Sequence, residues 1–203
     1  MKIDSEKIIL LHPGKTGGTS LEHTLRDMYL SGKKLVAKET DRDLMFGLDR
    51  KYHVYLQHAD LRLYKILNIP FTEYKTITTV RRPYERILSC YYYNGKATRY
   101  NFEEFVLKHL EKHKLASNVK KYSMGHFSPQ HFFARIDDYK VDHVLHKENL
   151  NEEAKEIGID VKYNYSKTGG MKNINAMDLY TEKMKDVVYN LYEEDFQLFG
   201  YDK

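Results

Sequence analysis

Short apolar runs and helically spaced apolar residues follow one another along the chain. Residues 7–11 read KIILL and stop at His12, a pattern that predicts a buried strand running into a loop. Beyond the loop, Leu21 and Leu25 recur at helical spacing, so we expect a helix that begins near residues 19–20. The chain is therefore expected to open with a strand, a loop and a helix.

The same succession returns further along the chain. Strands are predicted over residues 53–57 (HVYLQ), 75–80 (KTITTV) and 141–146 (VDHVLH). Helices are predicted over residues 84–93 after Pro83, from a capping box of Asn101 and Glu104, and over residues 181–196. Alternating strands and helices predict an α/β fold with a central parallel sheet flanked by helices. Ligands bind such sheets at the carboxyl ends of the strands, so the loops after residues 11, 57 and 80 are expected on one rim.

Composition narrows the class of protein. The 203 residues, 41% hydrophobic and 31% charged, fit one globular domain over residues 1–203. No apolar run approaches the roughly 20 residues that span a bilayer, and the N-terminal residues lack a secretory pattern. The one cysteine, Cys90, excludes an internal disulfide, so we expect a cytoplasmic protein without a membrane partner. The net charge of +4 suits an anionic ligand but is too small to predict nucleic-acid binding.

Residues 13–20, with the sequence PGKTGGTS, form the strongest local motif and are called the phosphate loop below. Glycines let successive backbone N–H groups approach an anion, and the following helix offers its positive end to the same anion. A lysine adds a mobile positive charge, and three hydroxyls add donors. The residues expected to bind phosphate are Lys15, Thr16, Gly17, Gly18, Thr19 and Ser20. A glycine turn that only joins strand and helix is the simpler alternative.

The ATP-binding P-loop is the competing interpretation of this motif. Residues 14–16 match its last three positions, but the glycine required five residues earlier is replaced by Ile9. A kinase that uses ATP and Mg²⁺ therefore remains an alternative, as does a nucleotide-binding module without catalytic activity.

A second candidate anion site follows the strand over residues 75–80, where the sequence reads RRPYERILS. Arg81 leaves the predicted strand at the same rim and carries a bidentate phosphate donor. Ser89 lies in the following helix, where its hydroxyl can meet the same phosphate. The alternative is that these arginines only pair with carboxylates such as Glu85.

Together the two motifs resemble those of one known family. "KTGGTSL" and "RRPYERILSCYY" are similar to the 5′- and 3′-phosphate motifs of the membrane-type carbohydrate sulfotransferases, the group that includes heparan sulfate 2-O-sulfotransferase. "SPQHFF", "VDHVLHKENL" and "LYEEDFQLFGY" continue the resemblance to the C-terminus. The resemblance implies a P-loop NTPase-like three-layer sandwich and 3′-phosphoadenosine 5′-phosphosulfate (PAPS) as sulfuryl donor. Gly14 and Arg82 depart from the family pattern, and a Golgi location does not carry over.

The positions of the motifs and the resemblance together suggest roles for individual residues. PAPS would be bound by residues 15–20 at its 5′ end and by Arg81 and Ser89 at its 3′ end, with 3′-phosphoadenosine 5′-phosphate (PAP) as product. Lys15 is the expected cation at the breaking bond, and His58 is the expected base for the acceptor hydroxyl. We expect the acceptor to be a carbohydrate. His12, His53 and Asp60 are the competing bases, His126 and His131 are expected to contact the acceptor, and Lys167 is a candidate for the nucleotide. No metal is expected, because the histidines show no ligand spacing.

Overall fold

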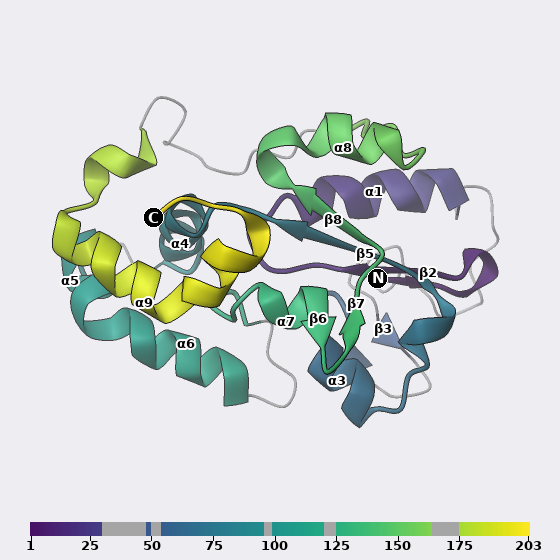
Figure 1. Cartoon of the computed structure of the whole chain (residues 1–203), viewed down its shortest axis with the longest axis horizontal. Helices are drawn as coiled ribbons and strands as arrows, with labels where there is room; N and C mark the ends of the chain where they lie inside the picture. Colours follow the sequence, from purple (N-terminus) through teal and green to yellow (C-terminus); the bar gives the residue numbers. More distant parts are fainter. Residues whose placement is uncertain (30–47, 50–53, 96–98, 120–124, 164–174) are drawn as a thin grey trace.

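A four-stranded sheet forms the centre of the protein in a computed structural model, which describes residues 1–29, 48–49, 54–95, 99–119, 125–163 and 175–203 (Figure 1). Its strands are β1 (Lys2–Ile3), β2 (Ile8–Leu11), β5 (Lys75–Val80) and β8 (His143–His146), in the spatial order β1-β2-β5-β8. The last three strands run parallel, and β1 pairs antiparallel with β2. The sheet is therefore mixed, with one short antiparallel edge.

Helices cover the sheet on both faces. On one face lie α1 (Gly18–Tyr29) and α8 (Leu150–Glu156), which appear above the strands in Figure 1. The other face is covered by α3 (Leu61–Ile66), α7 (His131–Ala134) and the hairpin of β6 (Arg135–Ile136) and β7 (Tyr139–Lys140). This layering is the α/β sandwich predicted from the alternation of strands and helices.

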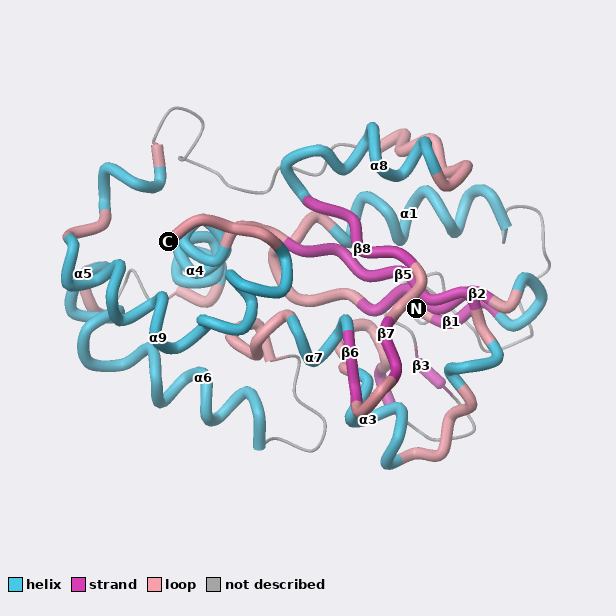
Figure 2. Tube along the Cα trace, in the orientation of Figure 1, coloured by secondary structure: helices cyan, strands magenta, loops and turns pink. Residues whose placement is uncertain are grey.

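A third group of helices gathers beyond one end of the strands (Figure 2). It contains α4 (Pro83–Tyr93), α5 (Phe102–Glu104), a π-helical turn (Phe105–His109), α6 (Leu110–Val119) and α9 (Glu182–Phe199). Short 3₁₀ turns lie at Asp4–Glu6, Phe71–Glu73, Lys147–Asn149 and Ala176–Leu179. No helix in the described part of the chain is both long and apolar enough to span a membrane.

Strand β2 shows why the sheet needs two covering layers. All four of its residues are buried, and successive side chains point to opposite faces. Ile8 and Leu10 pack with apolar residues of α1 and α8, whereas Ile9 and Leu11 pack with those of α3 and α7. Four consecutive apolar residues in a strand can therefore all be buried only when both faces of the sheet are covered.

Local sequence signals set several helix ends. The side chain of Asn101 accepts a hydrogen bond from the backbone N–H of Glu104 at 2.8 Å, and Thr181 caps α9 in the same way. Pro83 occupies the first turn of α4, where its missing N–H leaves no intrahelical bond unmade. Gly200, with φ of 68°, ends α9 in the left-handed conformation.

One expected strand lies outside the central sheet. The prediction over residues 53–57 corresponds to β4 (Val54–Tyr55), which pairs antiparallel with β3 (Leu48–Asp49) in a separate two-stranded sheet. The prediction that the loop after residue 57 reaches the rim because its strand belongs to the central sheet was therefore wrong. A short apolar run identifies a strand but does not specify its partner.

Candidate functional site

Three loops meet at the carboxyl ends of the parallel strands. The phosphate loop follows β2, Arg81 and Arg82 follow β5, and Lys147 follows β8. The guanidinium of Arg81 lies 3.5 Å from the backbone oxygen of Lys15, and the aliphatic stem of Lys147 lies against Gly17. Residues more than sixty positions apart are thus brought to one rim, as the parallel topology predicts.

The backbone of the phosphate loop adopts conformations that side chains rarely tolerate. Lys15 has φ of 71° and Gly17 has φ of 88°, both in the left-handed region. The hydroxyl of Thr16 donates to the carbonyl of Pro13 at 2.6 Å and lies 2.7 Å from the hydroxyl of Thr79. The Thr16 side chain therefore fastens the loop to β5, so its contribution to an anion falls to its backbone N–H.

Three glycines of the loop lie so close to other side chains that a Cβ atom would collide. At Gly14 it would lie 2.3 Å from Cδ2 of His126, and at Gly18 it would lie 2.1 Å from Cδ2 of His12. At Gly17 it would lie 2.5 Å from Cδ of Lys147. Such distances are far below van der Waals contact, so the glycines allow two histidines and a lysine to approach the loop backbone.

His58, the expected base, lies beside the phosphate loop. Its Nδ1 is 2.7 Å from the backbone oxygen of His12, and a carbonyl oxygen can only accept a hydrogen bond. Nδ1 therefore carries the proton in the neutral ring, and Nε2, which has no hydrogen-bond partner among the described residues, holds the lone pair. Although β4 is not part of the central sheet, this bond holds His58 at the end of β2.

Two other imidazoles surround His58. Its ring centroid is 4.6 Å from that of His12 and 5.2 Å from that of His126, both in edge-on arrangements. Burial and the neighbouring His12 and His126 lower the pKa of His58 well below its ordinary value. Burial, Lys15 and Arg86 lower the pKa of His126 to about 4. Both rings are therefore neutral near pH 7, the form in which an imidazole accepts a proton.

His12 stands in front of a buried carboxylate. Its Nδ1 lies 3.2 Å from Oε1 of Glu22, although the two atoms are not aligned as a hydrogen bond. The other carboxylate oxygen of Glu22 accepts a hydrogen bond from the amide of Gln57 at 2.9 Å. Burial alone would raise the pKa of Glu22, but His12, the N-terminal ammonium and Gln57 together hold it below its ordinary value. His12, one of the competing bases, is thus tied to the interior of the protein.

Aromatic residues at the end of α4 border the same site. The ammonium of Lys15 lies 4.1 Å from the ring centroid of Tyr93, a cation–π distance. The Tyr93 ring is 4.9 Å from the ring of His126 and remains 58% exposed. His126 also lies 3.3 Å from the side-chain oxygen of Asn94. The expected cation and one expected acceptor residue therefore share an aromatic neighbour.

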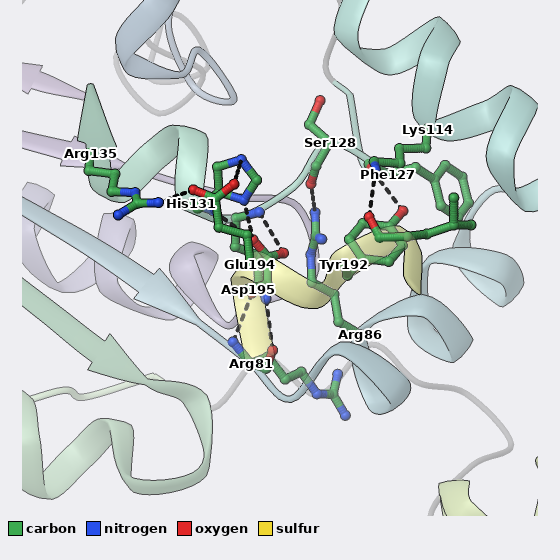
Figure 3. Close-up of polar contacts among 12 residues, drawn as sticks. Arg81, Arg86, Lys114, Phe127, Ser128, His131, Arg135, Tyr192, Glu194 and Asp195 are labelled. Carbon is green, nitrogen blue, oxygen red and sulfur yellow. Dashed lines mark hydrogen bonds and ion pairs between the residues drawn. The ribbon is translucent and has the colours of Figure 1, made fainter. Parts of the chain in front are cut away.

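Arg81 is held in place through its backbone. Its N–H donates to Oε1 of Gln130 and its carbonyl accepts from Nε2 of the same side chain, each at 2.9 Å. Gln130 is itself anchored, because its backbone N–H donates to the buried Asp195 at 2.8 Å. The Arg81 guanidinium points away from Asp195 (Figure 3), which leaves it directed toward Lys15 and the phosphate loop.

Ser89, the expected partner of Arg81, lies in α4. It is 2% exposed, and its hydroxyl has no hydrogen-bond partner among the described residues. A buried hydroxyl without a partner costs free energy, so an acceptor from outside the chain would satisfy it.

Arg86 is a structural residue of the site that the sequence interpretation missed. Its side chain is fully buried and donates to the carbonyls of Gly14 at 3.1 Å and His126 at 2.9 Å. It also donates to the carbonyl of Ser128 at 2.7 Å (Figure 3). It therefore joins α4, the phosphate loop and the segment carrying His126. No local signal distinguishes it from the two arginines before it.

His131 is fully engaged by acidic residues of α9. Its Nδ1 lies 2.8 Å from Asp195 and its Nε2 lies 3.3 Å from Glu194 (Figure 3). The Asp195 carboxylate also accepts the His131 backbone N–H at 2.9 Å. Because both ring nitrogens have carboxylate partners, we assign His131 no part in acceptor binding below.

The other residues considered for the site are placed as follows. Asp60 caps α3 and pairs with Arg62. Glu148 accepts from the Arg82 N–H at 3.0 Å and from the Tyr201 hydroxyl at 3.1 Å. His53 and Lys167 lie outside the described residues. Among the residues that the structure describes, no group of three or more histidine, cysteine or acidic side chains is arranged to hold a metal ion.

The fold and the loop geometry define an α/β protein with a phosphate-loop-like site at the carboxyl edge of its sheet. Sequence comparison makes the class more specific: the sulfotransferase family model matches residues 2–202. The chain belongs to the sulfotransferase family. Comparisons with curated proteins and with solved structures gave no significant match.

Proposed function

We propose that this sulfotransferase uses PAPS as donor and transfers the sulfuryl group to the hydroxyl of a carbohydrate acceptor. The observation that carries the proposal is the state of His58 beside the phosphate loop. Its Nδ1 is bonded to the His12 carbonyl, and its lowered pKa keeps Nε2 ready to accept a proton.

Several described residues fit a donor with two anionic ends. Gly17 and Gly18 lie at the N-terminal end of α1, whose backbone N–H groups suit the 5′-phosphosulfate. Arg81 and the unpartnered hydroxyl of Ser89 suit the 3′-phosphate. Loop residues Lys15, Thr16, Thr19 and Ser20 complete the proposed donor site.

The proposed chemistry divides between two residues. When bound, PAPS supplies a sulfur atom whose bond to the 5′-phosphate oxygen breaks as the acceptor oxygen bonds to it. Nε2 of His58 takes the proton of the acceptor hydroxyl. The Lys15 ammonium stabilises the negative charge that develops on the departing phosphate. His126, neutral and bordered by Tyr93, is proposed to contact the acceptor.

Calorimetry and a transfer assay test this proposal. PAP is expected to bind more tightly than ATP with Mg²⁺, and Arg81→Ala is expected to weaken PAP specifically. With [³⁵S]PAPS and a panel of desulfated polysaccharides, His58→Gln is expected to lower transfer by about 100-fold or more while PAP affinity changes less than about twofold. His143→Gln is the matched control, because His143 is the first residue of β8 and lies at the end of the strand away from the rim.

Three results would contradict parts of the proposal. Binding of ATP with Mg²⁺ in preference to PAP would favour a kinase. Full activity of His58→Gln would show that another residue is the base. PAP binding without sulfation of any polysaccharide would remove the carbohydrate acceptor.

A further inference from the structure

Lys147 is a cation at the rim of the sheet. It has no role in the function proposed above. It follows β8 directly, and β8 pairs parallel to β5 with His146 opposite Val80. Lys147 and Arg81, the residues after these partners, therefore leave the sheet side by side. Burial and Arg81 lower the pKa of Lys147, which is consistent with this closeness.

The stem of Lys147 runs along the phosphate loop. A Cβ atom on Gly17 would lie 2.5 Å from Cδ and 3.1 Å from Cε of Lys147. Gly17 has φ of 88°, so its lack of a side chain serves both the loop conformation and the passage of this lysine. Cε of Lys147, the last carbon before the ammonium, therefore lies beside the backbone of the phosphate loop.

The Lys147 ammonium is not in an ion pair with any residue in the described part of the protein. It makes no hydrogen bond or ion pair with any described residue, although the side chain is half-buried. The adjacent carboxylate of Glu148 is otherwise engaged, since its oxygens accept from the Arg82 N–H and the Tyr201 hydroxyl. Neither Lys147 nor Arg81 makes an ion pair among the described residues, although Glu148 lies near Lys147 and Glu85 lies near Arg81. A bound anion would stabilise these two neighbouring cations.

A cavity opens beside the lysine. Its volume is about 190 Å³, and its lining includes Ser20 of the phosphate loop, Lys147, Asn149 and Tyr163, together with Glu148 and Glu152. The cavity therefore connects the loop expected to hold a phosphate with the side chain of Lys147.

We propose that Lys147 is a donor-binding residue that pairs with the 5′-phosphate of the bound nucleotide, together with the phosphate loop. This inference rests on the proposed function, because it requires a 5′-phosphorylated nucleotide at the rim. It adds a third cation to Lys15 and Arg81 and assigns it to the 5′ end, because its stem lies on Gly17 rather than on α4.

The test compares Lys147→Met with the wild-type protein, using calorimetry with PAP, 3′-AMP and 5′-AMP. The ratio of PAP affinity to 3′-AMP affinity measures what the 5′-phosphate contributes, and this ratio is expected to fall about tenfold or more in Lys147→Met. The corresponding ratio for the 3′-phosphate, PAP against 5′-AMP, is expected to change less than about twofold. Lys147→Arg is expected to restore most of the lost contribution.

The melting temperature of the protein without nucleotide separates binding from structure. Removing an unpaired cation next to Arg81 is expected to leave the melting temperature of Lys147→Met unchanged or raised. Lys155→Met, an exposed lysine on α8, is the control and is expected to alter neither affinity ratio. A purely structural lysine would instead lower the melting temperature and weaken all three nucleotides alike.

The outcomes distinguish this inference from the proposed function. A wild-type protein that does not prefer PAP to both monophosphates would overturn the donor assignment itself. A wild-type protein that prefers PAP, with an unchanged 5′-phosphate ratio in Lys147→Met, would overturn only the role of Lys147. Loss confined to the 3′-phosphate ratio would also overturn it, because the lysine would then serve the other end of the nucleotide.

Discussion

Asp195 on α9 binds the segment that contains Gln130 and His131. Replacing Asp195 by alanine is the sharpest test of how this segment is attached to α9. The carboxylate is fully buried and accepts three hydrogen bonds. They come from the Gln130 N–H at 2.8 Å, the His131 N–H at 2.9 Å and His131 Nδ1 at 2.8 Å. Asp195→Ala leaves these donors without a partner.

The expected loss follows from those contacts. An unsatisfied buried donor costs about 1–3 kcal/mol, and removing one member of a buried charged pair costs about 3–5 kcal/mol. We therefore expect Asp195→Ala to lower the free energy of unfolding by about 3–5 kcal/mol. For a chain of this length, that loss corresponds to a fall in melting temperature of about 6–20 °C.

Urea denaturation followed by far-ultraviolet circular dichroism measures this loss directly. Asp186→Ala is the matched control, because this exposed aspartate lies on the same helix and pairs with Lys203 at the surface. The control is expected to change the free energy of unfolding by less than about 1 kcal/mol. If Asp195→Ala also stayed below about 1 kcal/mol, the inferred network around Gln130 and His131 would be refuted.

Two further predictions concern the loop and the histidines. Gly17→Ala is expected to weaken PAP binding by about tenfold or more, because its Cβ would lie 2.5 Å from Cδ of Lys147 and displace that side chain. Gly95→Ala, also at positive φ but with nothing within 4 Å, is expected to keep the affinity. Calorimetry measures both, and equal effects would implicate backbone strain alone. His126 has a folded-state pKa of about 4 against about 6.5 unfolded, so the unfolded chain binds more protons and stability falls as pH drops from about 6.5 toward 4. His126→Gln is expected to lose less melting temperature over that range, and identical slopes would contradict the assignment.

The fold could be predicted where the signal was local. The β-branched run over residues 75–80 became β5 with the same bounds, and Pro83 began α4 as expected. The antiparallel edge strand β1 was missed because two residues carry no periodicity. The pairing of β4 with β3 could not be read from an apolar run, since such a run does not specify which strand lies beside it.

The same contrast applies to the candidate site. The phosphate loop was identifiable because its glycines, lysine and hydroxyls lie within eight consecutive positions. Arg86 bonds to Gly14 across 72 positions and Gln130 to Arg81 across 49, so their roles exist only after folding. Lys147 needed the register between β5 and β8 to place it beside Arg81.

The close contacts of the loop glycines have a consequence for how related sequences can differ. The backbone at position 14 shares its space with His126, and position 18 shares its space with His12. A larger residue at either glycine requires a smaller or rotated partner, so substitutions at these positions should occur in pairs among homologues. A homologue that replaces His126 by a small residue relieves the side-chain collision at position 14, while the Cα of residue 126, at 3.2 Å, still restricts what fits there.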